Sequence, residues 1–547
     1  MAPSASVSKR PYSSIPQSEN ESVGVEQVKT GTTLLPEPLY TRDRDYAPSL
    51  SQQQQQKSKY TRAGGGGGSG GGDDEASQEE FELETLNNFD YEVEIDESGL
   101  QQQQEAESGS DGTSNMKMAF MNMTNSILGA GIIGQPLAFR NSGFLGGILV
   151  MILLTFLIDW TLRLIVKNSI LAHRAKSYQD TVHYCFGLWG KIVLLLAISS
   201  FAYGGCMAFC VIIGDTIPHV LGAFLPNSVT QGSFGWFFQR NVIIVVFTSC
   251  ISYPLSLNRD ISKLAKASAF ALAGMFVIVV LTVVRAPFVS PSQRGAVHSY
   301  EWVVNYNIFQ GISVISFALV CHHNTMFIYQ SMRNATLAKF SKLTHISCLI
   351  SMIFCMIMGL NGFLNFGNLT KGNILNNFKS NDNWINVARL CFGLNMLTTF
   401  PLEIFVVRDV LKDILLARKV IREGAASASD LELSKMQHFA ITTLLVFTSM
   451  SVSLFTCNLG MILELIGATS ASLMAYIIPP MCYYKLSWSQ FDWAQATAKE
   501  KKRFTIFKAL PSIACIAFGF AVMFISSGMT IRDAMENKDI SDHCVVD

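Results

Sequence analysis

Apolar stretches of about 20 residues recur along the chain after Asn115, and short polar connections separate them. A helix of this length crosses a hydrocarbon core of about 30 Å. Because backbone groups in lipid must pair within their own segment, these stretches are predicted to be helices rather than strands. The eleven expected spans are Met118–Phe139, Gly143–Lys167, Lys191–Leu221, Val242–Leu257, Ser262–Val284, Ile308–Tyr329, Ile346–Phe366, Ile385–Val407, Phe439–Cys457, Met461–Tyr483 and Ile506–Ser527.

The first 114 residues have a different composition. They contain glutamine runs at Gln52–Gln56 and Gln101–Gln104, a glycine-rich run at Gly64–Gly72, and an acidic stretch, Asp73–Asp111, without lysine or arginine. Such a segment cannot bury enough apolar surface to offset the entropy of ordering, so residues 1–114 are predicted to be a disordered tail. No apolar signal-peptide core opens the chain, and the tail is therefore expected in the cytosol.

Lysine and arginine gather in every second connection between the predicted spans. These basic stretches are Arg163–Lys176, Arg259–Lys266, Arg333–Lys342, Arg408–Arg422 and Lys499–Arg503. If the tail is cytosolic, all of them face the cytosol, as basic connections usually do. Residues 115–530 then form the transmembrane domain, and residues 531–547 form a short luminal tail. Asn368, in an Asn-x-Thr sequon on the opposite side, is a candidate glycosylation site.

Composition excludes several classes of function. Hydrophobic residues make up 49% of the 547 residues and charged residues 15%, below the roughly 25% of a soluble domain. The 41 basic side chains balance the 41 acidic ones, which argues against a nucleic-acid partner. No phosphate loop, dinucleotide fingerprint or nucleophile elbow is present, so neither catalytic residues nor an organic cofactor are expected. Most of the 12 cysteines, Cys457 among them, lack metal-ligand spacing and are predicted to be packing residues.

The first predicted span contains residues that disfavour a continuous helix. Three glycines, a proline and two asparagines lie within Asn122–Pro136. Glycine costs about 1 kcal/mol and proline about 3 kcal/mol in a helix interior, so a break is expected here. Unwound backbone at this depth must line a cavity or be buried in protein. The neighbouring Asn125, Ser126 and Gln135 favour a cavity, whereas close helix packing by the small residues of Gly129–Gly131 is the alternative.

The sixth span has a second interruption, at Ser316–Thr325, where two histidines and an asparagine lie inside an apolar run. Such side chains should face water or be satisfied by other helices. Spans one to five and six to ten form two sets of five, and an odd number of crossings reverses the direction of the chain. Broken helices at corresponding positions of inverted repeats indicate the central site of a transporter.

The breaks also suggest a ligand. A half-helix that starts near Gly129–Gly131 would present backbone N–H groups to a carboxylate, and freed carbonyl groups would suit an ammonium group or a cation. A zwitterion fits both ends. On the eighth span, Thr398 and Thr399 could complete a small-cation site with Asn125, although such threonines often bond back to the preceding turn instead.

Four segments resemble the signatures of the amino acid/auxin permease family, which includes fungal vacuolar amino acid transporters and animal sodium-coupled neutral amino acid transporters. They are Asn125–Ile132, Phe317–His322, Thr399–Pro401 and Glu464–Ala468, within a similarity over about residues 115–530. The resemblance implies an all-α polytopic membrane protein of the LeuT type, with about eleven helices, a five-plus-five inverted repeat, one extra helix and alternating access. The long tail is most similar to fungal vacuolar members.

The resemblance implies that the substrate lies against the backbone of helices one and six. The expected substrate-binding residues are Ser126, Ile127, Gly129, Ala130, Gly131, Tyr203, Phe317, Cys321 and His322. The expected ion-coupling residues are Asn125, Thr398, Thr399, His322 and Glu464. In the sodium-coupled branch, the positions of Asn125 and Thr399 belong to the cation site. Vacuolar members resemble proton-coupled machines, so the coupling ion is expected to be H⁺ or Na⁺. Tyr203 could equally be a packing residue.

Proton coupling would require a titratable group on the pathway. The candidates inside or at the ends of the spans are His322, His323, Glu403, Glu464 and Asp215. His322 is favoured, because histidine titrates closest to neutral pH and this one lies at the sixth-helix break, and Glu464 comes next. Glu464 could instead be a luminal cap, and Glu403 could be only a structural partner of Arg408.

The sequence therefore predicts a secondary active amino acid transporter of an endomembrane, with an amino acid and the lipid bilayer as its partners. The vacuolar membrane is the expected location, with the endoplasmic reticulum or the plasma membrane as alternatives. An amino acid sensor that signals through the N-terminal tail is the alternative function.

Overall fold

The computed structural model describes residues 112, 114–225, 235–259, 268–423 and 433–536. In this part of the chain the secondary structure is helical, with no strand and one isolated bridge between Ser114 and Met332. The predicted tail lies outside the described residues, apart from its last few positions. Most of the predicted luminal tail also lies outside them, although the last helix continues to Met535.

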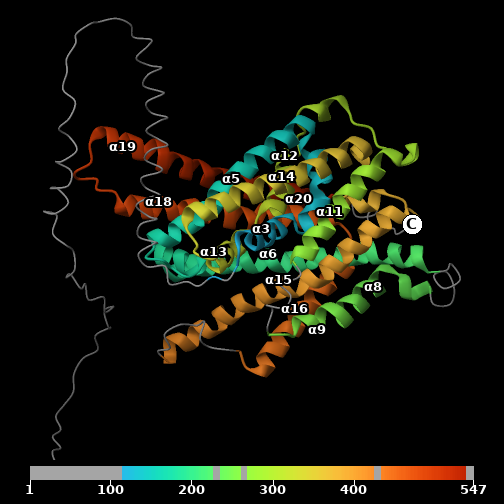
Figure 1. Ribbon diagram of the computed structural model, residues 1–547, viewed down its shortest axis with the longest axis horizontal. Coiled ribbons are helices and arrows are strands. Elements are labelled where there is room, and N and C mark those ends of the chain that lie inside the picture. Colours follow the sequence, from blue (N-terminus) through green and yellow to red (C-terminus); the bar gives the residue numbers. More distant parts are fainter. Residues whose placement is uncertain (1–111, 113, 226–234, 260–267, 424–432, 537–547) are drawn as a thin grey trace, which may run out of the picture. The chain divides into compact units, whose positions relative to one another are not determined.

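Nine helical segments of the described chain are long and apolar enough to cross a membrane. They are α5 (Phe144–Leu171), α6 (Tyr178–Phe224), α11 (Ser268–Arg285), α12 with α13 (Ile308–Leu319 and Thr325–Ser331), α14 (Leu337–Phe366), α15 (Asn383–Glu423), α16 (Lys435–Phe455), α17 with α18 (Leu459–Ile466 and Ile478–Gln490) and α19 with α20 (Ala498–Phe504 and Leu510–Met535) (Figure 1).

Two further apolar segments complete the expected set. The first consists of α3 (Met116–Leu128), the 3₁₀ helix η1 (Ala130–Gly134) and α4 (Gln135–Ser142). The fourth is short and consists of α8 (Arg240–Phe247), η3 (Thr248–Ser252) and α9 (Tyr253–Ser256). The predicted all-α polytopic architecture is thus confirmed. The breaks occur in the first and sixth segments, the first member of each set of five.

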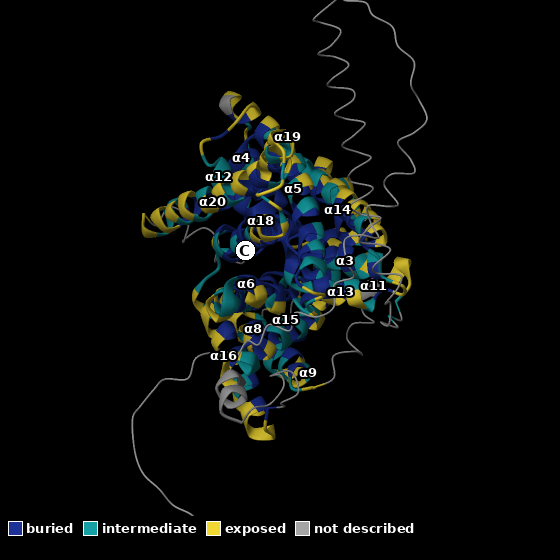
Figure 2. Ribbon diagram, turned by 90° about the vertical axis from the view of Figure 1, so that its left-hand side faces the viewer, coloured by how far each residue is buried: buried dark blue, intermediate teal, exposed yellow. Residues whose placement is uncertain are grey.

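Large apolar side chains cover the outer surfaces of the helices. Examples are Leu153, Phe156, Leu444 and Phe524, each at least 65% exposed. Figure 2 shows exposed residues along the outer turns of the ribbons and buried residues between the helices. A water-soluble protein rarely exposes so much contiguous apolar surface, whereas a membrane protein presents it to lipid.

The helices pack in two groups. In the first group, α14 packs against α3, α4 and α5, and α12 packs against α4 and α5. In the second group, α6 packs along α15, α16 and α8. Helix α17 contacts both α12 and α6 and therefore lies between the groups. Both broken segments belong to the first group.

Several helices begin earlier than the apolar pattern predicts. Helix α6 begins at Tyr178 rather than Lys191, and it bends at Gly187, whose φ of 67° favours glycine. Helix α14 begins at Leu337 rather than Ile346. Both start with a side-chain cap: the hydroxyl of Ser177 accepts the N–H of Asp180 in α6, and that of Thr336 accepts the N–H of Lys339 in α14. Hydropathy detects only the apolar part of such helices.

The prediction that Cys457 is a packing residue is wrong. Cys457 follows the end of α16 and forms a disulfide bond. Ten other cysteines among the described residues are free, and most of them are buried between helices. A disulfide was not expected because the spacing of cysteines along the sequence does not reveal which of them meet in space.

Candidate functional site

The first break lies at Gly129. Helix α3 ends at Leu128, and Gly129 has φ 14° and ψ −142° while its N–H still bonds to the carbonyl of Asn125. The chain then continues as η1 and resumes as α-helix at Gln135. A side chain added at Gly129 would meet no atom within 4 Å, so open space adjoins the break. The predicted interruption of this segment is therefore confirmed.

Gly131, two residues further on, is tightly packed. A Cβ atom at Gly131 would lie 2.4 Å from Cα of Ala318 in α12. Its carbonyl oxygen accepts a hydrogen bond of 2.9 Å from Nε2 of Gln135. Close packing, the alternative weighed for these glycines, is therefore what the structure shows at Gly131, where the backbones of the two broken segments touch.

The second break follows Leu319, the last residue of α12. Val320 is extended, and the chain resumes as α13 after the turn η7 (His322–Asn324). Nε2 of His322 lies 2.9 Å from Oγ1 of Thr161 in α5. Neither ring nitrogen of His323 has a hydrogen-bond partner among the described residues. His322 is thus held by a neighbouring helix, whereas His323 has unused hydrogen-bonding capacity.

The two breaks face each other. Nδ2 of Asn324 lies 3.4 Å from Oγ of Ser126, which joins the second break to α3. The ring of Phe201 in α6 lies 5.3 Å from that of Phe317 and 5.3 Å from that of His323, measured between centroids. Backbone breaks, hydroxyl, amide and aromatic groups from three segments therefore converge at one place.

Sequence reasoning chose Tyr203 as the aromatic side chain of α6 and missed Phe201. Two residues along a helix turn the side chain by about 200°, so Tyr203 points away from the second break when Phe201 faces it. The packing of α6 against α12, and not the sequence, decides between them. Of the other residues expected to bind substrate, Ile127, Ala130 and Cys321 are buried.

The threonines of the eighth span bond back to the preceding turn. Oγ1 of Thr398 donates to the carbonyl of Leu394 at 3.1 Å, and Oγ1 of Thr399 donates to that of Asn395 at 2.8 Å. Thr398 is exposed on the outer face beside Leu394, whereas Asn395 is buried. Thr399 is therefore better placed than Thr398 for a cation site with the half-buried Asn125, and that site stays a prediction.

Glu464 lies beside a small polar cavity of about 100 Å³. Its Oε1 accepts from Nδ2 of Asn141 at 2.9 Å, and its Oε2 accepts from Oγ1 of Thr530 at 3.1 Å. Nε2 of Gln310 lies 3.4 Å from Glu464 and donates to Asp533 at 3.0 Å. The carboxyl group of Glu464 is thus held by hydrogen bonds from α4, α12 and α20.

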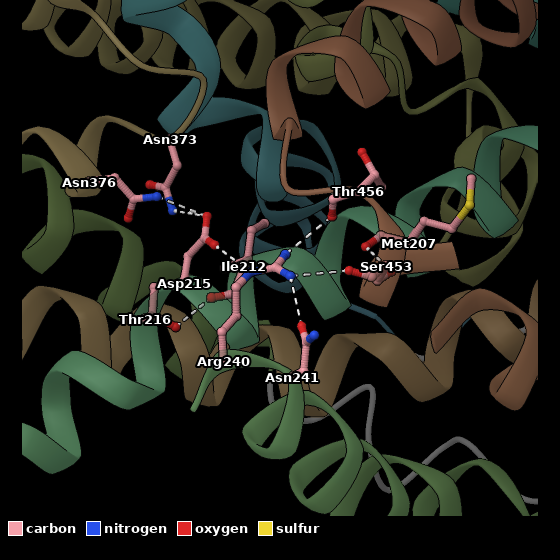
Figure 3. Close-up of polar contacts among 10 residues, drawn as sticks. All are labelled: Met207, Ile212, Asp215, Thr216, Arg240, Asn241, Asn373, Asn376, Ser453 and Thr456. Carbon is pink, nitrogen blue, oxygen red and sulfur yellow. Dashed lines mark hydrogen bonds and ion pairs between the residues drawn. The ribbon is translucent and has the colours of Figure 1, made fainter. Parts of the chain in front are cut away.

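Asp215 belongs to a buried polar cluster that joins distant parts of the chain (Figure 3). Its Oδ1 lies 3.3 Å from Nε of Arg240 in α8, and both side chains are at most 7% exposed. Its Oδ2 accepts from the side-chain amides of Asn373 and Asn376, at 3.4 Å and 3.0 Å, in the connection between α14 and α15.

The guanidinium group of Arg240 extends the same cluster to the end of α16. It donates to the carbonyl groups of Ser453 and Thr456, both at 3.3 Å. The cluster therefore connects α6, α8, α16 and the α14–α15 connection. This environment gives Asp215 a structural partner for each of its oxygens and argues against a role as a mobile proton carrier.

Glu403 forms no hydrogen bond or ion pair with Arg408, which was the alternative, structural role considered for it. Arg408 donates instead to the carbonyl of Ser256 at 2.8 Å and to Oγ1 of Thr442 at 3.0 Å. Five residues separate the two side chains along α15, so they point in different directions from the helix.

Asp159 is a buried carboxyl group that sequence reasoning missed. Its Oδ2 accepts from Nη2 of Arg163 at 3.0 Å and lies 2.9 Å from Nδ1 of His345. The contact with His345 joins α5 to α14. A charged residue within an apolar run was the signal that could have identified Asp159.

The candidate glycosylation site lies after α14. Asn368 is exposed, and its Oδ1 accepts from the N–H of Ala296 at 3.0 Å. Thr370, the third residue of the sequon, is 1% exposed and donates to the carbonyl of Gly367. Modification of Asn368 stays a prediction, and the buried threonine argues against it in the folded protein.

The match to a family of known proteins covers this whole arrangement. The family model described as "Transmembrane amino acid transporter protein" matches residues 112–532. The chain belongs to this family. It is thus an integral membrane protein that transports amino acids, not an enzyme, and the resemblance inferred from the four sequence segments is confirmed.

Individual relatives of this amino acid transporter agree with the family match. It is 49% identical over 439 residues to vacuolar amino acid transporter 2 of Saccharomyces cerevisiae, over 80% of this chain and 87% of the relative. It is 34% identical over 376 residues to the putative sodium-coupled neutral amino acid transporter 11 of Mus musculus, over 69% and 79%. The crystal structure of MhsT in complex with L-phenylalanine aligns with a TM-score of 0.46 at 13% identity, over 77% of this chain and 99% of that one.

Proposed function

We propose that the protein is a secondary active amino acid transporter of the vacuolar membrane, coupled to protons and working by alternating access around the two helix breaks. The observation that carries this proposal is the meeting of the breaks: Asn324 reaches Ser126, and open space adjoins Gly129. Unwound backbone at membrane depth is stable only where it lines a cavity or is buried in protein. The open space at Gly129 fits a cavity at that position.

The breaks suit the two charged ends of an amino acid. Backbone N–H groups at the start of η1 form the positive end of a short helix, which attracts a carboxylate. The last carbonyl groups of α12 have no helical partner, and they suit the ammonium group. The rings of Phe201 and Phe317 lie beside this place and offer an apolar surface to the substrate side chain.

Alternating access would use the two groups of helices. The first group carries both breaks, and the second, built on α6 and α15, packs beside it. Rocking of one group against the other around a fixed site is the usual mechanism of transporters with broken helices. Residues that join the second break to α5, such as His322 with Thr161, would move within the first group.

Two observations support a vacuolar location with the tail in the cytosol. The yeast relative at 49% identity is named as a vacuolar transporter. Cys457, just after the end of α16, forms a disulfide, and disulfides persist in compartments that oxidise thiols. The basic connections put the end of α16 on the luminal side, in agreement with that bond. Nothing in the described residues favours the alternative of a sensor.

The proposal is tested with the purified full chain in sealed proteoliposomes. A panel of radiolabelled amino acids is offered under an imposed pH gradient, an imposed sodium gradient, or neither. We expect at least one amino acid to accumulate under the pH gradient, and a protonophore to abolish that accumulation. Accumulation under the sodium gradient alone would show that the coupling ion is wrong, and no uptake under any condition would contradict transport.

Replacing Gly129 with leucine tests the position of the substrate site. The Cβ atom of the leucine would meet no atom within 4 Å, so the side chain should enter the open space beside the break and displace the substrate. We expect uptake to fall about tenfold or more, because small displacements at a binding site have large effects on rate. Gly528→Leu is the matched control, since Gly528 also has no atom within 4 Å. Equal uptake by the two variants would place the site elsewhere.

A further inference from the structure

Glu403 is a carboxyl group inside the helix assembly that pairs with no other side chain in the described part of the chain. Helix α15 packs along α6, and a Cβ atom added at Gly205 of α6 would lie 4.0 Å from Cγ of Glu403. Oε2 of Glu403 is buried and has no hydrogen-bond partner among the described residues. None of the ion pairs in that part of the chain includes it. A partly buried acid in a membrane domain whose Oε2 atom is buried without a partner points to a function rather than a structural role.

Glu403 borders the proposed substrate site. Gly205, whose Cα–H faces Glu403, lies one helical turn beyond Phe201 and therefore on the same side of α6. The ring of Phe201 packs against Phe317 and His323 at the second break. One face of α6 thus contacts the second break at one turn and lies beside the side chain of Glu403 at the next.

Few other titratable groups surround Glu403. From α6, the thiol of Cys206 interacts electrostatically with the carboxyl group, and the ring of His323 contacts Phe201 on the same face of α6. The other helices packed against α15, which are α11, η3, α9 and α16, bring no charged side chain to Glu403 within the described residues. No described cation therefore neutralises this carboxyl group.

We propose that Glu403 carries the proton whose movement drives amino acid transport, an inference that rests on the proton-coupled function proposed above. An ionised carboxyl group is costly to bury without an opposite charge, so protonation of Glu403 favours closure of the site around the substrate. When the site opens to an acidic lumen, a carboxylate oxygen takes up a proton from water. When it opens to the cytosol, the O–H bond breaks and the proton returns to water there. One proton moves in each cycle, and no other bond changes.

The test compares Glu403→Gln with the wild-type protein in proteoliposomes. Glutamine preserves the shape of the side chain but cannot carry a proton. We expect accumulation driven by a pH gradient to fall about tenfold, to the level seen without a gradient. The reason is that binding of the amino acid would no longer be coupled to binding of a proton. Exchange of labelled for unlabelled amino acid, which needs no net proton movement, should continue. Continued exchange would also show that the variant is folded.

Two further variants separate this role from a structural one. Glu403→Asp keeps a titratable group in a shorter side chain and should restore part of the gradient-driven accumulation. Asp409→Asn removes an exposed carboxyl group from the same helix and should leave accumulation unchanged. Proton entry, followed with a pH-sensitive dye in the vesicles, should accompany substrate movement in the wild type and not in Glu403→Gln.

Three results would overturn the proposal. The first is wild-type accumulation by Glu403→Gln under the pH gradient. The second is loss of both exchange and accumulation in the glutamine and aspartate variants, which would indicate a structural role. The third is loss of exchange only for lysine and arginine, which would assign the carboxyl group to recognition of cationic substrates. If the wild-type protein itself shows no proton-driven uptake, the proposed function fails irrespective of Glu403.

Discussion

Replacing Arg240 with methionine is expected to lower the free energy of unfolding by about 3 kcal/mol, because it leaves the buried carboxylate of Asp215 without its cation. The same change removes the hydrogen bonds to the carbonyl groups of Ser453 and Thr456. Asn373 and Asn376 still donate to Asp215, which keeps the loss at the lower end of the range for broken buried pairs. The apparent melting temperature of the purified protein in detergent measures the effect.

A double variant shows whether the pair acts as a unit. Asp215→Asn, added to Arg240→Met, removes the unpaired charge and should recover part of the lost stability. Arg532→Met is the control. The side chain of Arg532 pairs with Asp533 but is 52% exposed. Exposed ion pairs contribute about 1 kcal/mol or less to the free energy of unfolding. Strictly additive effects of the two single changes, or an Arg240→Met variant as stable as the wild type, would contradict coupling between Asp215 and Arg240.

Replacing Gly131 with alanine is expected to cost about 2 kcal/mol of stability and most of the transport activity, because the added methyl group overpacks the contact between the two breaks. Its Cβ would lie 2.4 Å from both Cα and Cβ of Ala318. The Cα atom belongs to the backbone of α12 and cannot rotate away, so α12 must shift relative to η1. Melting temperature and amino acid uptake are measured on the same preparation.

A compensating change distinguishes a backbone collision from a side-chain collision. Ala318→Gly removes the Cβ atom of Ala318 but not its Cα, so Gly131→Ala combined with Ala318→Gly should recover little. Gly129→Ala is the matched control, because no atom lies within 4 Å of the added methyl group and stability should change little. Wild-type stability and uptake in Gly131→Ala would refute the close contact.

Gly129 and Gly131 show what the local sequence cannot predict. Both lie in one short glycine-rich stretch, and the local pattern predicts the helix break for both. The structure places open space beside Gly129 and the backbone of Ala318 beside Gly131. A bulky replacement at Gly131, which is the more obvious test from the sequence, would therefore report on packing rather than on substrate binding.

The buried carboxyl groups show the same limit. Each is recognisable as an unusual charge in an apolar run, yet its role depends on partners from remote parts of the chain. Asp215 meets Arg240, and Glu464 meets Asn141. Glu403 meets no partner among the described residues, although the sequence pattern had suggested Arg408. Helix direction and packing decide these contacts.

The recurrence of apolar segments, their helical nature and the places where two of them break follow from the sequence by itself. The reason is that the length of an apolar run and the local cost of glycine and proline are properties of neighbouring residues. The tertiary structure decided which residues of the breaks touch each other, which aromatic side chain of α6 faces them, and which buried acid is left without a partner. Those outcomes depend on the rotation and packing of helices that are far apart in the chain, and no local pattern encodes them.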